Sequence, residues 1–203
     1  MEATAPRVKR KDGLKRQGEI MAAALKLFAE KGFAATSIND IIEAAGAARG
    51  TFYLHFTGKG DLLKMIVETY LRQLDAVIET LDISMDLPGE ELRQLYRDSV
   101  RALAREPEVK CFVKVMLRES LGTETQERVS EFFEKVVQVS ARYIAQAQQS
   151  GRVVRSLEPV ALSVCIVGAV KELLLRWTTA EASFDLEASV DTAIEVYFRG
   201  MLA

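Results

Sequence analysis

The sequence of 203 residues contains little of what metal centres, disulfide-rich folds and β-sheets require. It has one histidine, His55, and two cysteines, Cys111 and Cys165, so most metal sites and histidine-based catalysis are excluded. With 12 glycines and 4 prolines, the chain also has few residues for the tight turns of an all-β fold. Two cysteines without a disulfide framework are typical of a reducing compartment.

Long hydrophobic runs are missing as well. The longest apolar stretch, from Val160 to Val170, ends at Lys171 and Glu172 and is too short to cross a bilayer. The basic residues near the N-terminus are followed by no apolar segment, so we expect no signal peptide. These features predict a cytoplasmic protein without a membrane partner.

Charge is distributed unevenly, although the net charge of the whole chain is only -2. Residues 1–60 carry ten basic and six acidic side chains, a net charge of +4, and the rest of the chain has a net charge of -6. A basic N-terminal part on an acidic body suggests that the N-terminal part meets a polyanion. A solvated charged tail would produce the same cluster, so charge alone leaves both interpretations open.

Apolar side chains recur at helical spacing along the whole chain, which predicts an all-α fold of nine helices and no strand. Three of these helices are expected to be short and to pack near the N-terminus. Ser37, followed by an acid at Asp40, has the pattern of a capping box. We expect Gly32, Gly46 and Gly151 to end helices, as left-handed glycines commonly do.

Proline and hydroxyl residues predict where the later helices begin, because proline suits the first helical turn and a hydroxyl can cap it. The expected starts are Pro88, Pro107, Thr123 with Gln126 as its capping-box partner, Ser156 as the cap of a helix over 157–178, and Leu186 for a last helix that ends near Met201.

Residues 37–55 have the pattern of two short helices joined by a glycine turn, which is the layout of a helix-turn-helix motif. In this motif the second helix, here 48–55, enters the major groove of DNA. Arg49 can donate two hydrogen bonds to a guanine, and Thr51 can contact a base or a phosphate. Ala48 and Gly50 are small enough to let the backbone approach the groove.

The run from Glu19 to Leu63 resembles the DNA-binding head of the TetR family of transcriptional regulators. The resemblance lies in ALKLFAEKGF, ATSINDI, AAGAARGTFYLHF and a lysine just downstream, and it covers about a fifth of the chain. The later helices are similar to the family's effector-binding body in order and length. Two departures stand out: Ala47-Ala48 supplies no capping hydroxyl, and Gly60 replaces an acid, so that Asp61 is the nearest substitute.

The resemblance implies a division of the chain and a role for each matching residue. The expected parts are a flexible basic tail (1–12), a three-helix helix-turn-helix DNA-binding domain (13–60) and a helical bundle for effector binding and dimerisation (61–203). Tyr53 and Lys59 match positions that contact phosphate, and His55 is placed near phosphate. The predicted DNA-binding set is Thr36, Ser37, Asn39, Ala48, Arg49, Gly50, Thr51, Tyr53, His55 and Lys59.

The predicted helix over 157–178 is apolar on nearly all sides, so it needs cover on all sides. A strip of small residues along it would permit the close approach of a helix from a second copy, and the last helix has a similar pattern. TetR-type proteins dimerise through two helices of each subunit, so we expect a homodimer. Packing within a monomer is the alternative. The expected interface residues are Ala161, Val164, Cys165, Gly168, Glu172, Ile194, Tyr197 and Phe198.

An effector pocket is harder to derive, because the apolar residues of the middle helices could equally form an ordinary core. If a ligand binds there, the lining favours a lipophilic molecule such as an acyl chain or an aromatic compound. The candidate effector-binding residues are Tyr96, Phe112, Met116, Arg118, Phe133 and Tyr143.

These patterns predict a homodimeric regulator, most simply a repressor, that binds a palindromic operator in double-stranded DNA and is released by a small-molecule effector. They predict no enzymatic activity and no cofactor, because catalytic histidine pairs, phosphate-binding glycine loops and metal-ligand spacings are missing. The alternative is a small-molecule-binding protein or enzyme on a TetR-like scaffold that does not bind an operator.

Overall fold

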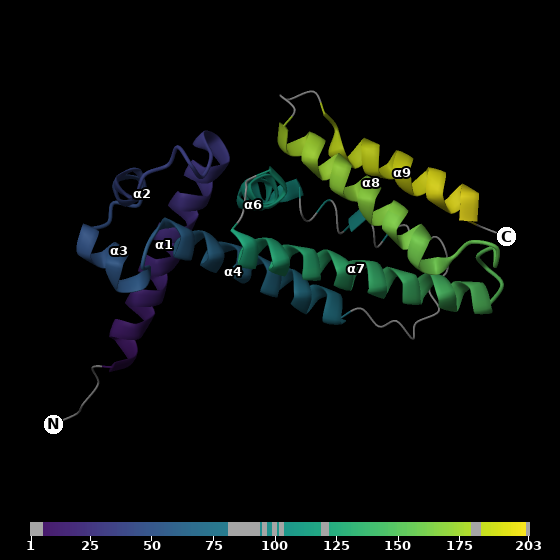
Figure 1. Ribbon diagram of the computed structural model, residues 1–203, viewed down its shortest axis with the longest axis horizontal. Coiled ribbons are helices and arrows are strands. Elements are labelled where there is room, and N and C mark those ends of the chain that lie inside the picture. Colours follow the sequence, from purple (N-terminus) through teal and green to yellow (C-terminus); the bar gives the residue numbers. More distant parts are fainter. Residues whose placement is uncertain are drawn as a thin grey trace. The chain divides into compact units, whose positions relative to one another are not determined.

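The structure is a computed structural model, and it confirms an all-α fold (Figure 1). It describes residues 6–80, 94, 97–98, 101, 104–118, 122–179 and 184–201, without the side chains of 6–11, 80, 123, 198 and 201. Within these residues there are eight helices and a single bridge residue, Val153, but no strand. The helices are α1 (Pro6–Lys31), α2 (Ile38–Ala44), α3 (Arg49–His55), α4 (Lys59–Thr80), α6 (Pro107–Arg118), α7 (Thr123–Gln149), α8 (Pro159–Thr179) and α9 (Leu186–Met201).

The prediction of nine helices therefore exceeds the eight described ones. The remaining predicted helix begins at Pro88, which lies outside the described residues. The six residues described in this part of the chain before Glu106 are all helical: Gln94, Arg97, Asp98, Arg101, Ala104 and Arg105.

The chain divides into two compact units, Met1–Thr69 and Tyr70–Ala203, which we call the head and the body. The core of the head forms where apolar faces of α1, α2, α3 and the first part of α4 meet. Its largest fully buried side chains include Phe28, Ile41, Phe52, Phe56 and Ile66. Burial of side chains of this size contributes about 1.5–3 kcal/mol each, so the head has a core of its own.

The first helix includes part of the segment that was predicted to be a flexible basic tail, 1–12. Helix α1 already begins at Pro6, so residues 6–12 form its first turns. Proline is well suited to this place, because the N–H that it lacks would have no helical partner there. Helix α1 is 26 residues long, and only α2 and α3, at seven residues each, are short helices.

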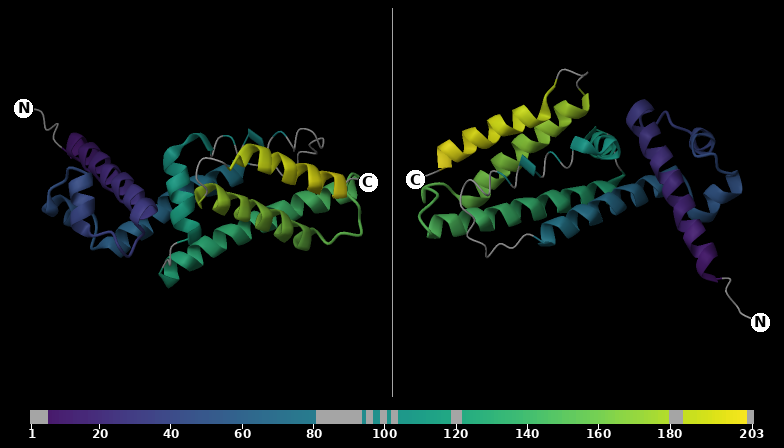
Figure 2. Two further views of the ribbon diagram at one scale, coloured as in Figure 1. Left: turned by 90° about the horizontal axis from the view of Figure 1, so that it is seen from above. Right: turned by 180° about the vertical axis from the view of Figure 1, so that it is seen from behind.

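Helix α8 holds the body together, since it contacts α6, α7 and α9 (Figure 2). A core cluster of the body consists of Ile144, Val153, Leu186, Val190 and Ile194, and half-buried side chains of α8 pack against it. Among the described helices, none is both long and apolar enough to cross a membrane.

Two of the predicted helix starts in the body are wrong by one to two residues. The N-cap of α7 is Gly122, one residue before the predicted cap Thr123, whose side chain lies outside the described residues. Helix α8 begins at Pro159, and Glu158 rather than Ser156 accepts hydrogen bonds from the backbone N–H groups of Val160 and Ala161. The residue before a proline avoids the helical region, so the helix cannot begin earlier than Pro159. The predictions for Pro107 and for 186–201 are confirmed.

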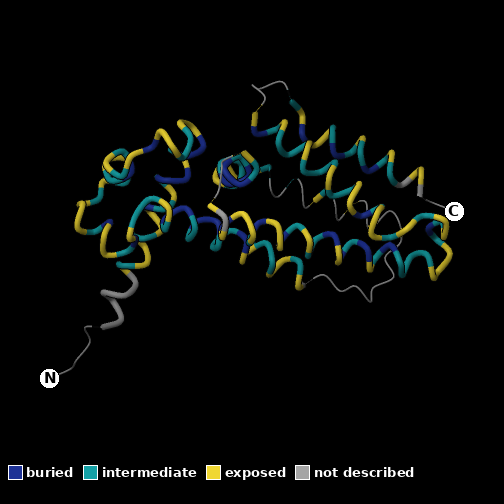
Figure 3. The backbone as a smooth tube through the Cα atoms, viewed as in Figure 1, coloured by how far each residue is buried: buried dark blue, intermediate teal, exposed yellow. Residues whose placement is uncertain are grey.

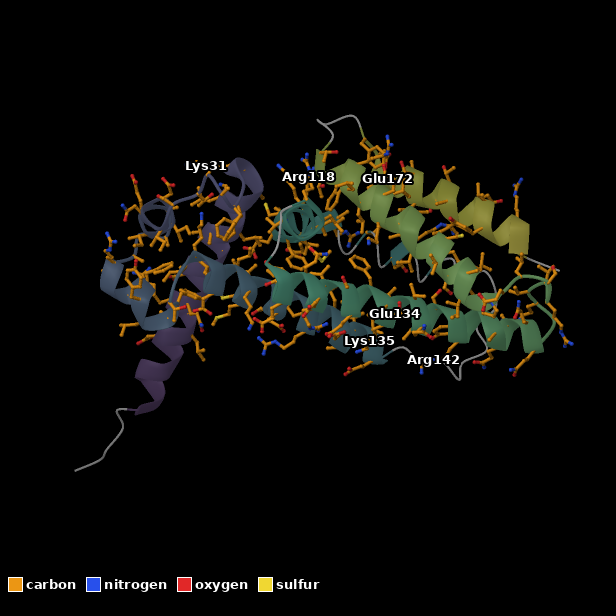
Figure 4. All side chains as sticks on the ribbon, viewed as in Figure 1. Lys31, Arg118, Glu134, Lys135, Arg142 and Glu172 are labelled. Atoms are coloured by element: carbon orange, nitrogen blue, oxygen red, sulfur yellow. The ribbon has the colours of Figure 1, made fainter. Side chains whose placement is uncertain are left out.

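Four charged side chains connect α4 to α7 within the body. Asp75 on α4 forms ion pairs with Arg128 and Lys135 on α7, and Lys135 also pairs with Glu79 at 3.0 Å. Lys135, labelled in Figure 4, thus lies on the side of α7 that faces α4. The Asp75 side chain is only 18% exposed, so this end of the cluster is shielded from solvent more than Glu79, at 70%.

These contacts shift the pKa values of Asp75 and Lys135. Burial by itself would raise the pKa of Asp75, but the hydrogen bonds from Arg128 and Lys135 outweigh it and lower the pKa below 3.8. The hydrogen bond to Glu79 raises the pKa of Lys135. Asp75 therefore stabilises the fold fully at pH values above 3.8, and this contribution disappears as the pH falls through the lowered pKa.

We predict that Asp75→Asn lowers the free energy of unfolding of the body at pH 7 by about 1–2 kcal/mol, because Arg128 and Lys135 lose a charged acceptor. Urea unfolding followed by the fluorescence of Trp177, the single tryptophan, measures the change. Glu79→Gln is the control and should cost less than about 1 kcal/mol, because its pair is exposed. Asp75→Asn should also lose less stability than the wild type when the pH falls below 4. Equal losses would show that Asp75 is not the titrating group.

Candidate nucleic-acid interface

The helix-turn-helix motif is built as the sequence predicts. Ser37 is the N-cap of α2, and its hydroxyl accepts a hydrogen bond from the N–H of Asp40 while the Asp40 carboxylate accepts one from the N–H of Ser37. These hydrogen bonds lower the pKa of Asp40, the backbone one most strongly. Gly46 has a φ of 56°, in the left-handed region, and allows the chain to turn from α2 to α3. Gly32, after α1, and Gly151, after α7, have the same conformation, as predicted.

Arg16 attaches the turn between α2 and α3 to α1. Its guanidinium donates hydrogen bonds to the carbonyl oxygens of Ala45 and Gly46, both at 3.4 Å, and to the carboxylate of Glu19 at 2.7 Å. The carbonyl groups at the C-terminal end of a helix carry partial negative charge, so a guanidinium stabilises them. The side chain thereby fixes the position at which α3 begins.

Two phenylalanines determine which face of α3 points outward. Phe52, within α3, and Phe56, its C-cap, are both buried, at 0% and 1% exposure. Four residues of α3 are exposed, namely Arg49, Gly50, Tyr53 and Leu54. Figure 3 shows buried and exposed positions along the backbone of the head. Tyr53 is 47% exposed and Leu54 is 82% exposed. The buried aromatic pair thus presents the predicted DNA-reading residues to the outside of the head.

Three of the predicted DNA-binding side chains lie together on this outer surface. The Arg49 guanidinium donates a long hydrogen bond of 3.5 Å to the Asn39 side-chain oxygen on α2. The same guanidinium carbon lies 5.9 Å from the centre of the Tyr53 ring, within the range of a cation–π contact. A weak hydrogen bond and an exposed ring hold Arg49 near its place without consuming its donors. Most of its five N–H groups can therefore turn to an acceptor on DNA.

Lys59, the first residue of α4, is placed differently from what a phosphate-binding lysine requires. Its Nζ donates hydrogen bonds to the carbonyl oxygens of Phe33 at 2.7 Å, Thr36 at 2.8 Å and Ala34 at 3.3 Å. It also lies 4.5 Å from the centre of the Phe33 ring. An ammonium group has three donors, so these three carbonyls use all of them. In this structure Lys59 holds the loop between α1 and α2 in place.

Thr36 corrects one predicted contact. Its side chain is 1% exposed, and its hydroxyl donates a hydrogen bond to the carbonyl oxygen of Gly32 at 2.8 Å. The hydroxyl therefore stabilises the end of α1 and cannot reach a phosphate. The neighbouring Ser37 remains exposed, although its hydroxyl is engaged with Asp40.

The remaining predicted residues of α3 lie at its edges. Ala48 is the N-cap of α3, and no side chain caps the helix there, which confirms the lack of a capping hydroxyl. Thr51 and His55 are half-buried, on the flanks between the buried and the exposed face. The Asp61 carboxylate accepts hydrogen bonds from the N–H of Thr57 at 2.8 Å and from its hydroxyl at 3.2 Å, so Asp61 stabilises the start of α4.

The predicted dimer residues of α8 form an exposed stripe on the body. Ala161, Val164, Cys165, Gly168 and Glu172 are all exposed, and Val164 has an exposed fraction of 54%. Glu172, labelled in Figure 4, forms an ion pair with Arg176 of the same helix.

The predicted dimer residues of α9 are less exposed than those of α8, where they are described. Ile194 is 7% exposed within the core cluster of the body, so it is not available for a contact between subunits. Tyr197 is half-buried, and its hydroxyl donates a hydrogen bond to the carbonyl oxygen of Cys165 at 3.0 Å. The side chain of Phe198 lies outside the described residues.

Five of the six candidate effector-binding residues lie on α6 and α7. Phe112 and Met116 are buried in α6, whereas Arg118 is exposed at the end of that helix (Figure 4). Phe133 and Tyr143 are half-buried on α7, ten positions apart, which corresponds to about 15 Å along the helix. Tyr96 lies outside the described residues.

A neighbouring cluster in the body was missed by the sequence analysis. The Tyr70 ring on α4 stacks on Phe112 with their centres 4.5 Å apart, and its hydroxyl donates a hydrogen bond to the Glu108 carboxylate at 3.2 Å. Burial, helped by the negative charge of Glu108, raises the pKa of Tyr70 to about 12. Elsewhere in the body, Nζ of Lys171 on α8 lies 4.2 Å from the centre of the Phe133 ring on α7. Helical spacing could have placed Tyr70 on the inner side of α4, but not opposite Phe112.

Comparison with known protein families assigns both units. A model of bacterial regulatory proteins of the tetR family matches residues 20–66. A model of the C-terminal region of YsiA-like proteins matches residues 68–200. The two matches together cover nearly all of the described chain.

Individual relatives are similar at low identity. The fatty acid metabolism regulator protein of Bacillus subtilis is 23% identical, over 90% of this chain and 94% of that protein. The uncharacterized HTH-type transcriptional regulator YerO of the same organism is 33% identical over 58% of this chain, but the match spans only 40% of YerO. The crystal structure of NalD, the secondary repressor of the MexAB-OprM multidrug efflux pump of Pseudomonas aeruginosa, has a TM-score of 0.77 and 25% identity. It covers 95% of this chain and 98% of NalD.

We predict that Lys59→Met destabilises the head by about 1–3 kcal/mol, because the carbonyls of the α1–α2 loop lose a charged donor. Thermal unfolding followed by circular dichroism measures the loss, and Lys26→Met, which replaces an exposed lysine of α1, is the matched control. If Lys59→Met weakened DNA binding without changing stability, the lysine would instead act directly on phosphate.

Gly50→Ala should have opposite effects on folding and on DNA binding. A Cβ at Gly50 would meet no atom within 4 Å, so alanine fits the free head and should stabilise α3 by about 0.5–1 kcal/mol. The added methyl would lie on the outer face of α3, where it would keep the helix away from the groove and weaken binding roughly tenfold. Gly60→Ala, also in open space, is the control for binding. Unchanged DNA affinity of Gly50→Ala would contradict a close approach of this face to DNA.

Proposed function

Because the chain belongs to the TetR family of bacterial regulatory proteins, we propose that it is a transcriptional repressor that binds operator DNA as a homodimer and responds to a small-molecule effector. The observation that carries this proposal is the outer face of α3. Arg49, Gly50 and Tyr53 are exposed on a helix that the buried Phe52 attaches to the core of the head. The proposed protein is a binding protein and not an enzyme.

Within this proposal, each head inserts α3 into the major groove of one half-site. Arg49 reads a guanine through two hydrogen bonds, which its loosely held guanidinium can form without breaking a strong internal contact. Asn39, next to it, and Tyr53 complete the contact to bases and phosphate. Lys59 contributes indirectly, because it holds the loop that leads into α2.

The exposed stripe of α8 supports the proposed dimer. Ala161, Cys165 and Gly168 recur at helical spacing on this stripe, and all three are exposed. A Cβ on Gly168 would meet no atom within 4 Å, so a second helix could approach the backbone closely there. A two-fold dimer of this kind presents two copies of α3 to the two halves of a palindromic operator.

The proposed effector is lipophilic and binds in the body. The aromatic side chains of α4, α6 and α7, such as Tyr70, Phe112 and Phe133, supply apolar surface near half-buried polar groups. The B. subtilis relative is named as a regulator of fatty acid metabolism, and NalD as a repressor of a multidrug efflux pump. An acyl compound and an aromatic compound are therefore the two effector classes to test first. The effector acts only if it binds one dimer conformation more tightly than the other.

Selection of binding sites from a library of random DNA duplexes tests the proposal. We expect the full-length protein to enrich palindromic sites, and Arg49→Ala to lose discrimination at one base pair of each half-site by about 1–3 kcal/mol. Arg105→Ala, which replaces an exposed arginine of the body, should leave the discrimination unchanged. If the wild type enriched no sequence, the chain would be a ligand-binding protein without an operator.

A further inference from the structure

The most exposed large apolar side chain of the described head belongs to Leu54, on the helix proposed to read DNA. Its exposed fraction is 82%, compared with 65% for Leu14 of α1 and 47% for Tyr53. A leucine that covers no core of its own chain gains nothing for the head by being apolar. Its burial against another molecule, by contrast, would be favourable.

The geometry of α3 places Leu54 where an approaching groove would meet it. Successive residues of an α-helix are about 100° apart, so Leu54 lies about 160° around α3 from the buried Phe52. It therefore points almost directly away from the core of the head. Gly50 lies one turn earlier on the same outer face, and no atom occupies the space that its side chain would fill.

The two residues together form a small apolar surface. Helical side chains lean toward the N-terminal end of their helix, so Leu54 leans over the preceding turn, toward Gly50. The missing side chain at Gly50 leaves the flank of the leucine open. Arg49 and Tyr53 lie beside this surface, and the head has a net positive charge. Together these features favour binding of an anion that carries an exposed apolar group.

We propose that Leu54, one helical turn after Gly50 on α3, reads the 5-methyl group of a thymine in each operator half-site and so adds a specificity-determining contact to that of Arg49. The thymine methyl is the one apolar group that B-form DNA presents in its major groove, and it distinguishes thymine from the other bases there. This inference rests on the proposed function. It adds a position at which the sequence is read by apolar contact instead of hydrogen bonding.

The test replaces each thymine of a selected duplex in turn by deoxyuridine, which removes only the methyl group. The full-length wild type should lose about fourfold in affinity at one position of a half-site, and about fifteenfold when both half-sites are changed. Leu54→Ala should bind the two duplexes within about 1.5-fold of each other at this position. Leu14→Ala, a matched loss of an exposed head leucine, should keep the wild-type discrimination.

The outcomes separate this inference from the proposed function. If the wild type bound its selected duplex but ignored every thymine methyl, the inference would be wrong and the proposed repressor would stand. If a methyl mattered equally to the wild type and to Leu54→Ala, another side chain would read it, and the inference would also be wrong. If no duplex were selected at all, both would fall. A change in oligomeric state of Leu54→Ala, with DNA affinity unchanged, would assign the leucine to a protein contact and overturn the proposal.

Discussion

The burial of Phe52 and Phe56 is the constraint on which the rest of the head depends. Both rings lie in the core with at most 1% of their surface exposed, and this fixes the rotation of α3 about its axis. A helix of seven residues is too short to be stable by itself, so its position must come from such tertiary contacts. The exposed face that carries Arg49, Gly50 and Leu54 follows directly from the buried one.

Hydrogen bonds from basic side chains to backbone carbonyl oxygens hold the segments around this helix in place. Arg16 holds the turn before α3, and Lys59 holds the loop before α2, each through carbonyl oxygens of the main chain. These two cations are therefore structural, although their charge adds to the attraction for a polyanion. Arg49 differs from both, because its contacts are weak and leave its donors available. Only the three-dimensional contacts distinguish the structural basic residues of the head from Arg49.

Much of the fold could be predicted from the sequence, because its signals are local. Ser37 and Asp40 cap α2 as expected, and Gly32, Gly46 and Gly151 adopt the left-handed conformation. The predicted starts of α7 and α8 differ from the observed ones, because a hydroxyl near a glycine or proline is only one of several possible caps.

Predictions that depend on long-range packing were less reliable. Thr36 and Lys59 are polar residues near the proposed DNA surface. Only the three-dimensional path of the α1–α2 segment shows that both side chains donate hydrogen bonds to its carbonyl oxygens. Ile194 looked like an interface residue, but Ile144 and Val153, far from it in sequence, cover it. The exposure of Leu54 was missed for the same reason, since apolar residues in a helix are usually assigned to a core.

The most direct measurement is a footprint of the full-length protein on the DNA upstream of its own gene, combined with binding across a salt series. The account predicts two symmetric protected half-sites about one helical turn apart, and an association constant that falls steeply as the salt concentration rises. Binding that is equal on all sequences, or protection of a single unpaired site, would contradict it.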